Sequence, residues 1–217
     1  MTGAEQTWTV VVAGGSGRRF GTLKQYELLG EARIIDRSRS VAAASSDGVV
    51  LVVPAADAER EGGVPGGATR SDSVRAGLAH VPDDAAIICV HDAARPFATP
   101  QTYRRVIDAV RAGADGAVPV VAVTDTIKIV DDDGVVVRTP DRETMVAVQT
   151  PQAFRADVLR AAHAGGDNST DDAGLVEQIG GRVVTVAGDE RNRKITRPDD
   201  LEWARNQVLV DSTGTVA

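Results

Sequence analysis

A glycine-rich segment followed by cations is the first part of the sequence that could do chemistry. It follows a β-branched run at 10–12. Glycine lets backbone N–H groups approach a ligand without a Cβ in the way, and a row of such donors binds phosphate oxygens. Cations behind them would neutralise a polyphosphate. The segment predicts a nucleotide-binding loop, with an ordinary strand-to-helix turn as the alternative. Its glycines and cations are Gly14, Gly15, Gly17, Arg18, Arg19 and Lys24.

Two familiar phosphate-binding loops can be compared with this segment directly. No Gly-Lys-Ser/Thr follows the glycines, so it is not a Walker A loop. Residues 15–20 begin like a dinucleotide fingerprint, but Phe20 stands where the third small residue belongs. An NAD site is therefore a weak alternative. The two arginines and the lysine favour a triphosphate.

A second candidate for chemistry is the block His-Asp-Ala-Ala-Arg-Pro at 91–96, which follows an apolar run. Polar groups crowded at the end of a buried strand cost desolvation unless they are paired or contact a ligand. A structural ion pair between Asp92 and Arg95 is the simpler interpretation. The position at the end of a strand favours a ligand site, with these polar groups emerging at the edge of the sheet.

The elements that would position these residues alternate along the chain. We expect strands at 9–13, 49–54, 86–90, 116–123 and 182–186, and helices at 34–46, 71–80, 99–112, 153–164, 171–179 and 198–207. We expect a surface loop at 55–67. Such alternation predicts an α/β fold with a doubly wound, mainly parallel, Rossmann-like sheet. Ligands bind such sheets beyond the C-terminal ends of the strands.

The regular alternation stops after 123. Two β-branched runs, 126–130 and 135–138, flank an Asp-Gly turn, which is a strong hairpin signal. Because an isolated two-stranded arm is marginal in water, we expect the arm at 124–144 to pack on a second subunit in a C2 homodimer. A hairpin folded back on its own sheet is the alternative. We expect a mobile tail at 208–217.

Composition limits the class of protein. The 217 residues suit one domain, and a formal net charge of −7 argues against broad binding to nucleic acid. The single cysteine, Cys89, lies in an apolar run and predicts no disulfide framework. Residues 1–7 show no signal peptide, and no apolar run is long enough to span a membrane. We therefore expect a cytoplasmic protein.

Eight short motifs occur in the order seen in the 2-C-methyl-D-erythritol 4-phosphate cytidylyltransferases, and the sequence resembles that family from Val10 to Ala204. The motifs lie at 13–19, 24–26, 70–74, 91–96, 125–128, 149–152, 170–173 and 194–196. The block at 91–96, together with the spacing of 18–19 from 24–26, makes the resemblance specific. It implies that CTP and methylerythritol phosphate are the substrates and that pyrophosphate leaves.

The resemblance also implies the catalytic residues, which are Arg19, Lys24, Arg142 and Lys194. Arg19 and Lys24 would stabilise the transition state at the α-phosphate, and Lys194 would hold the incoming phosphate. Arg142 and Thr126 would reach that phosphate from the partner subunit. A phosphate monoester is mostly dianionic at neutral pH, so it needs orientation and charge neutralisation rather than a strong base.

The remaining implied residues bind the two substrates. Backbone carbonyls can accept hydrogen bonds from the 4-amino group of cytosine, which distinguishes it from uracil. The nucleotide-binding residues would be Ala13, Gly14, Gly15, Ser16, Gly17, Gly67, Ala68, Ser73 and Asp92. The polyol phosphate would contact Asp92, Arg95, Thr126, Arg142 and Lys194. Mg²⁺ would be held mainly through the CTP phosphates, with no protein metal ligand.

The sequence departs from the family pattern in places. Leu23 stands where proline is usual, the interval from Arg19 to Lys24 is short, and Ala68 replaces a common acidic residue. Asp171 and Asp172 match the family but have helix capping as an alternative role. Two other functions stay open: a cytidylyltransferase for another polyol phosphate, such as ribitol 5-phosphate, and a non-catalytic nucleotide- or NAD-binding module.

Overall fold

The computed structural model describes residues 5–14 and 23–213. Several residues of the predicted nucleotide loop therefore lie outside the described residues. They are Gly15, Ser16, Gly17, Arg18 and Arg19.

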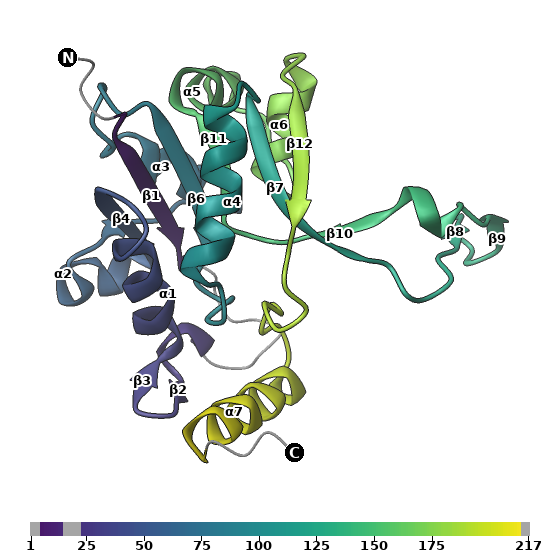
Figure 1. Ribbon diagram of the computed structural model, residues 1–217, viewed down its shortest axis with the longest axis horizontal. Coiled ribbons are helices and arrows are strands. Elements are labelled where there is room, and N and C mark those ends of the chain that lie inside the picture. The colour runs from purple at the N-terminus through teal and green to yellow at the C-terminus, as the bar shows by residue number, and fades with distance from the viewer. Residues whose placement is uncertain (1–4, 15–22, 214–217) are drawn as a thin grey trace.

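An eight-stranded sheet forms the centre of the molecule (Figure 1). Its path is β10 (Val146–Val148), β7 (Gly116–Ala122), β11 (Gln152–Arg155), β6 (Ile87–Asp92), β1 (Thr7–Val12), β4 (Gly48–Val53) and β5 (Val64–Pro65), and β12 (Val183–Ala187) pairs with β7. β1, β4, β5 and β6 are parallel, as are β7 and β12, whereas β11 is antiparallel to β6 and β7. Since β11 opposes both β6 and β7, those two strands run the same way. The predicted mainly parallel sheet is confirmed.

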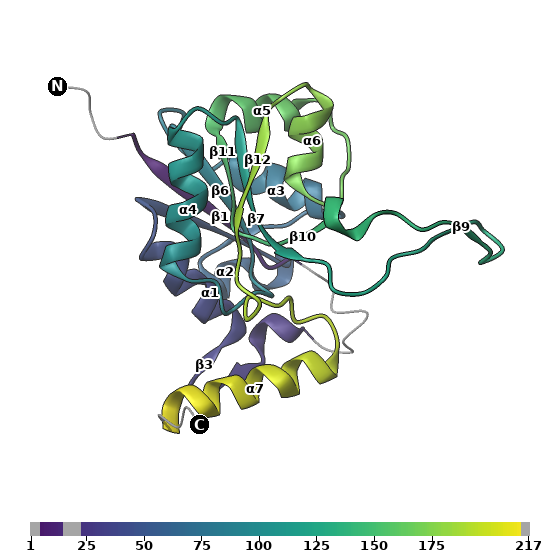
Figure 2. The same ribbon diagram turned by 45° about the vertical axis from the view of Figure 1, so that its right-hand side comes forward.

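Helices cover both faces of the sheet (Figures 1 and 2). One face packs against α1 (Ile34–Ala43) and α4 (Pro100–Arg111). The other packs against α3 (Arg70–Leu78), α5 (Ala156–Ala164) and α6 (Asp172–Gln178). Valine, leucine, isoleucine and alanine fill both layers, with Tyr103 and Phe154 the largest fully buried side chains. The doubly wound prediction is therefore also confirmed.

The prediction of a surface loop at 55–67 was wrong. This segment contains a 3₁₀ turn η2 (Ala55–Asp57), the short helix α2 (Ala58–Glu61) and the edge strand β5. Val64 pairs with Val52 of β4. The polar, glycine-rich composition hides a strand that only its neighbour in the sheet specifies.

The predicted helix at 153–164 begins later than expected. Residues 152–155 form β11, which inserts antiparallel between β6 and β7, and α5 starts at Ala156. β10 pairs with β7 at 120–122, just beyond the positions that β11 contacts. Neither strand has a clear local signal, because each is short and is specified by partners distant in sequence.

The hairpin projects from the body of the molecule (Figure 2). Its strands β8 (Ile129–Val130) and β9 (Val136–Arg138) form a separate two-stranded sheet, and Gly134 in the turn has a φ of +80°. The 3₁₀ turn η3 (Arg142–Thr144) follows. The predicted hairpin is confirmed, and its alternative, a hairpin folded back on the main sheet, is wrong.

A small third layer lies below the sheet in Figure 1. It contains η1 (Lys24–Tyr26), the hairpin of β2 (Leu28–Leu29) and β3 (Ala32–Arg33), and the helix α7 (Pro198–Thr213). Leu29, Ile195 and Leu201 are buried in its core. α7 passes the expected end at 207 and includes residues 208–213 of the predicted tail. Among the described residues, no helix is both long and apolar enough to cross a membrane.

Candidate active site

A polar cavity of about 310 Å³ lies at the C-terminal end of β6. It is bounded by the segment between β10 and β11, the start of α6 and the loop before α7. Three predicted site residues meet there, namely Asp92, Arg95 and Lys194. The other lining residues are Arg70, Val148, Gln149, Thr150, Gln152, Thr170 and Asp171.

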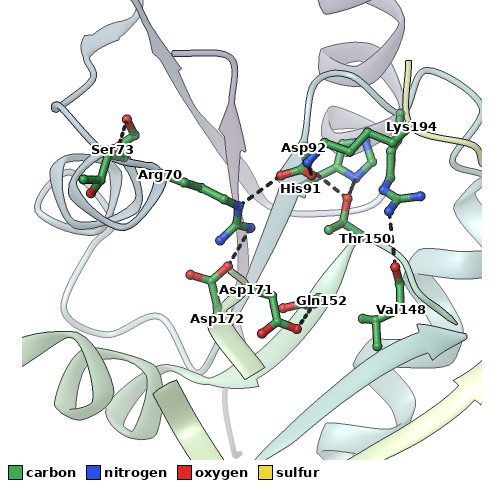
Figure 3. A network of polar contacts seen from close by, with 12 residues as sticks. Arg70, Ser73, His91, Asp92, Val148, Thr150, Gln152, Asp171, Asp172 and Lys194 are labelled. Carbon is green, nitrogen blue, oxygen red and sulfur yellow. Dashed lines mark hydrogen bonds and ion pairs between the residues drawn. The ribbon is translucent and has the colours of Figure 1, made fainter. Parts of the chain in front are cut away.

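Asp92 is the centre of the contacts around this cavity (Figure 3). Lys194 Nζ donates to its Oδ2 at 2.6 Å, and Arg70 Nε donates to its Oδ1 at 3.3 Å. Its backbone N–H donates to Thr150 Oγ1 at 3.0 Å. β6 carries the residue to the edge of the sheet, and three other segments fix both carboxylate oxygens and the amide.

The charges around Asp92 determine its protonation state. Burial by itself raises the pKa of this carboxyl, but the positive charges of Arg70 and Lys194 outweigh burial and hold the pKa well below its usual range. Asp92 is therefore an anion that holds Lys194 at the cavity.

Arg70 also contacts a second buried carboxylate. Its Nη2 lies 2.8 Å from Asp172 Oδ2, and His163 Nε2 lies 3.0 Å from Asp172 Oδ1. Burial lowers the pKa of Arg70, but the negative charges of Asp172 and Asp92 raise it by more than burial lowers it. The net shift of the pKa is therefore upward. The guanidinium carries its charge between two anions.

Arg95 does not form the ion pair with Asp92 that the sequence offered as the simpler interpretation. Its Nη1 donates to Asn192 O at 2.8 Å and its Nη2 to Val148 O at 3.2 Å. Burial lowers the pKa of Arg95 below its usual value. The partners of Asp92 are instead Arg70 and Lys194, which are remote in sequence.

His91 does not emerge at the edge of the sheet as expected. Its side chain is fully buried, with its ring centroid 5.7 Å from that of Tyr103 on α4 and its Nδ1 3.1 Å from Thr150 Oγ1. The strand continues through 91 and 92, and alternation along a strand sends these neighbours to opposite faces. Burial lowers the pKa of His91 to about 4, so the ring is neutral.

Three residues predicted to bind the base come together at the start of α3. An added Cβ on Gly14 would lie 3.1 Å from Ser73 Oγ, and one on Gly67 would collide with Asp72. The Gly67 N–H donates to Ser73 Oγ at 3.2 Å, while Ser73 Oγ donates to Thr69 O at 3.0 Å. The start of α3 therefore requires glycine at Gly67 and leaves little room for a side chain at Gly14.

Lys24 is connected to the neighbourhood of Lys194. Its Nζ donates to Ile195 O at 2.6 Å, and the Ile195 N–H donates to Ala94 O at 2.8 Å. The side chain of Ile195 is fully buried in the layer below the sheet. Ile195, the neighbour of Lys194 in the chain, therefore connects Lys24 to the loop after β6.

Other predicted residues lie apart from this cavity or do not line it. Thr126 and Arg142 are exposed on the arm, where Arg142 Nη1 donates to Thr124 O at 3.1 Å. Ala13 is buried at the end of β1, and its N–H donates to Val52 O at 2.7 Å. Ala68 is exposed in the loop before α3.

Several cavity residues were not predicted as site residues. Arg70, Gln149, Thr150, Gln152, Thr170 and Asp171 belong to motifs quoted for the family resemblance, so those motifs were the available signal. Asp171 Oδ1 accepts the N–H of Gly174 at 3.1 Å and so caps α6. Helix capping was the alternative role predicted for this residue. Asp172, by contrast, is buried against His163 and Arg70.

A second cavity, of about 340 Å³, lies at the opposite end of the sheet, between the start of β1, the end of α1 and α4. It contains none of the predicted site residues. Because ligands of open α/β sheets bind beyond the C-terminal ends of the strands, the smaller cavity is the stronger candidate. Among residues 5–14 and 23–213, no three His, Cys, Asp or Glu side chains gather to hold a metal ion.

A mainly parallel, doubly wound sheet with cations at its C-terminal edge is typical of an α/β nucleotide-binding enzyme. Residues 7–210 match the family described as IspD, 2-C-methyl-D-erythritol 4-phosphate cytidylyltransferase. The chain belongs to this family.

Individual relatives agree with this assignment. The cytidylyltransferase of Rhodococcus jostii is 44% identical over 212 residues, covering 92% of this chain and 93% of that protein. The one from Nocardia farcinica is 50% identical over 165 residues, covering 76% of this chain and 70% of that protein. The crystal structure of the Thermus thermophilus cytidylyltransferase superposes with a TM-score of 0.80 at 31% identity, covering 93% and 98% of the two chains.

Proposed function

We propose that this chain transfers CMP from CTP to 2-C-methyl-D-erythritol 4-phosphate, giving 4-diphosphocytidyl-2-C-methyl-D-erythritol and pyrophosphate. Membership of the family supports the reaction. The observation that carries it is the placement of Lys194 on ionised Asp92, with Lys24 held on the carbonyl of the next residue, Ile195.

The chemistry suits fixed cations. An oxygen of the substrate phosphate attacks the α-phosphorus of CTP in line, and the bond from that phosphorus to the bridging oxygen breaks as pyrophosphate leaves. No proton has to be removed from the dianionic phosphate. Lys24, together with Arg19, neutralises charge at the α-phosphate, and Lys194 orients the incoming phosphate.

Selection of cytosine falls to the loops that meet beside α3. Ser73 accepts the N–H of Gly67 and stands against Gly14, so the two loops meet at this side chain. Ala13 and Ala68 complete this part of the site through their main chains. Gly15, Ser16 and Gly17 contribute donors to the CTP phosphates. Asp92 and Arg95 bind ribose or polyol hydroxyls.

The active unit is a homodimer formed through the arm. Most large hydrophobic side chains that are exposed among the described residues lie on the arm or at its base. They are Ile129, Val130, Val135, Val136, Val137, Val146 and Val148. Exposed apolar side chains gathered on one projecting segment favour an interface there. Thr126 and Arg142 from the partner then complete the site for the polyol phosphate.

Mg²⁺ would be held mainly by the phosphates of CTP, as this ion prefers few protein ligands. The carboxylates at the cavity fit this assignment, because Asp92 is already shared by Arg70 and Lys194 and Asp171 caps α6. When bound, the ion neutralises charge on the leaving pyrophosphate. The protein works in the cytoplasm.

The test is an incubation of the protein with CTP, Mg²⁺ and either methylerythritol phosphate or ribitol 5-phosphate. We expect pyrophosphate release with methylerythritol phosphate and little with ribitol 5-phosphate. Chelation of Mg²⁺ by EDTA should abolish the release. Faster turnover of ribitol phosphate would replace the assigned substrate, although nothing in the cavity favours it. Binding of CTP without any pyrophosphate release would make the chain a nucleotide-binding module.

A further inference from the structure

A row of five polar side chains, buried at its α5 end, leads from α5 to the cavity. His163 Nε2 lies 3.0 Å from Asp172, and Asp172 lies 2.8 Å from Arg70. Arg70 lies 3.3 Å from Asp92, and Asp92 lies 2.6 Å from Lys194. Figure 3 shows Arg70 between the two carboxylates, reaching from α3 toward β6 and α6. The five residues come from five separate segments.

The far end of the row is not part of the cavity wall. Asp172 is 0% exposed and His163 is 3% exposed, and neither lines the cavity. Although burial raises the pKa of Asp172, the hydrogen bond from His163 and the charge of Arg70 lower it below its usual value. An ionised carboxylate only accepts hydrogen bonds, so His163 Nε2 carries the proton and donates it.

An isolated carboxylate is expensive to bury, and a hydrophobic pair could join α5 to α6 at least as well. What the anion does here is orient Arg70. With Asp172 in place, the guanidinium is held from its Nη2 side and presents Nε to Asp92. Without it, Arg70 would be free to turn fully onto Asp92 and compete with Lys194 for the same carboxylate.

We propose that Asp172 and His163 are positioning residues for the transfer reaction. They hold Arg70, Arg70 holds Asp92, and Asp92 sets the place of Lys194. This inference rests on the proposed function for the role of Lys194 toward the incoming phosphate.

The first test is a double-mutant cycle of Asp172→Asn and Lys194→Ala. Loss of a charged hydrogen bond weakens the row, so Asp172→Asn lowers kcat/KM roughly 10- to 100-fold. The loss appears more in KM for the polyol phosphate than in KM for CTP. In the Lys194→Ala background the same change has little further effect, because both act through one group. An equal loss in both backgrounds would overturn the proposal.

The matched control is Asp115→Asn. Asp115 pairs with Arg155 and accepts the Arg182 N–H at the opposite end of the sheet. This variant lowers the melting temperature without changing either KM. If Asp172→Asn behaves in the same way, Asp172 has a structural role only.

A second pair of variants keeps the proposal testable if Asp172→Asn fails to fold. His163→Leu removes the donor to Asp172, whereas His163→Gln retains an N–H on a side chain of similar reach. We expect impaired kcat/KM in the first and recovery in the second, and equal activities would refute the role of His163. Wild-type pyrophosphate release, measured in parallel, separates failure of this proposal from failure of the assigned reaction.

Discussion

The cavity and the arm differ in how far one chain completes them. At the cavity, Asp92 is bound through both carboxylate oxygens and its amide, and Asp172 behind it is fully buried. On the arm, Val137 is 65% exposed and Val135 is 61% exposed, and the hairpin strands pair only with each other in the described chain. One region is held by contacts within the chain, and the other presents apolar surface outward.

This difference separates two kinds of preparation for catalysis. Charges near a reacting phosphate are effective when they are fixed before the substrate arrives, and the row around Asp92 meets that condition. A two-stranded ribbon has no core of its own, and packing of the arm on a second subunit, as proposed above, would give it order. Under the proposed function, fixed charge is supplied within the subunit, whereas closure of the polyol site would come from assembly with a second subunit.

The largest effect on activity is expected from removing one of the cations at the cavity. Lys24→Ala and Lys194→Ala each lower kcat/KM roughly 10²- to 10³-fold, because one charge at the transferring phosphate is removed. Steady-state pyrophosphate release measures the loss. Lys24 is partly buried and Lys194 is exposed, so the melting temperatures stay near that of the wild type. Weaker CTP binding with unchanged turnover would contradict a catalytic role.

A smaller change in activity tests whether the arm of one subunit contributes to the site of the other. Mixing inactive Arg142→Ala subunits with inactive Lys24→Ala subunits places one intact site in each heterodimer. With random exchange, half of the dimers are mixed, so about a quarter of wild-type activity returns. The readout is activity after subunit exchange, alongside the heterodimer fraction from two affinity tags. No recovery in tagged heterodimers would show that the site does not span the interface.

The smallest effect on catalysis comes from His91, which lies behind the cavity. Its pKa of about 4 lies below the ordinary 6.5, so the unfolded chain binds a proton between those values and the folded chain does not. The stabilisation is complete above pH 6.5 and is lost as the pH falls toward 4. Between pH 7.5 and 5 this amounts to on the order of 2 kcal/mol.

The control for this prediction is His91→Asn, which has no titrating group but keeps polar atoms near Thr150 Oγ1. Denaturant midpoints measured from pH 7.5 to 5 should fall less steeply in the variant than in the wild type. Equal slopes would mean that other groups cause the acid sensitivity.

The sequence predicted most of the regular elements because their signals are local. Thr99 and Pro100 mark the start of α4, and Thr99 Oγ1 does accept the Thr102 N–H. The Asp-Gly turn identified the hairpin, and the short motifs identified the family. Among the strands that escaped prediction, β5, β10 and β11 are two to four residues long and are specified by their partners in the main sheet.

By itself, the sequence determined the layered α/β fold, the family and the presence of cations near a phosphate loop, because periodicity, caps and motif spacing are properties of neighbouring residues. Only the tertiary structure decided which charged side chains pair with one another. Asp92 pairs with Arg70 and Lys194 rather than with nearby Arg95, and Asp172 reaches Arg70 across 102 positions of the chain. Such pairings follow from how strands and helices pack, and charge alone does not select one partner among the 24 lysines and arginines.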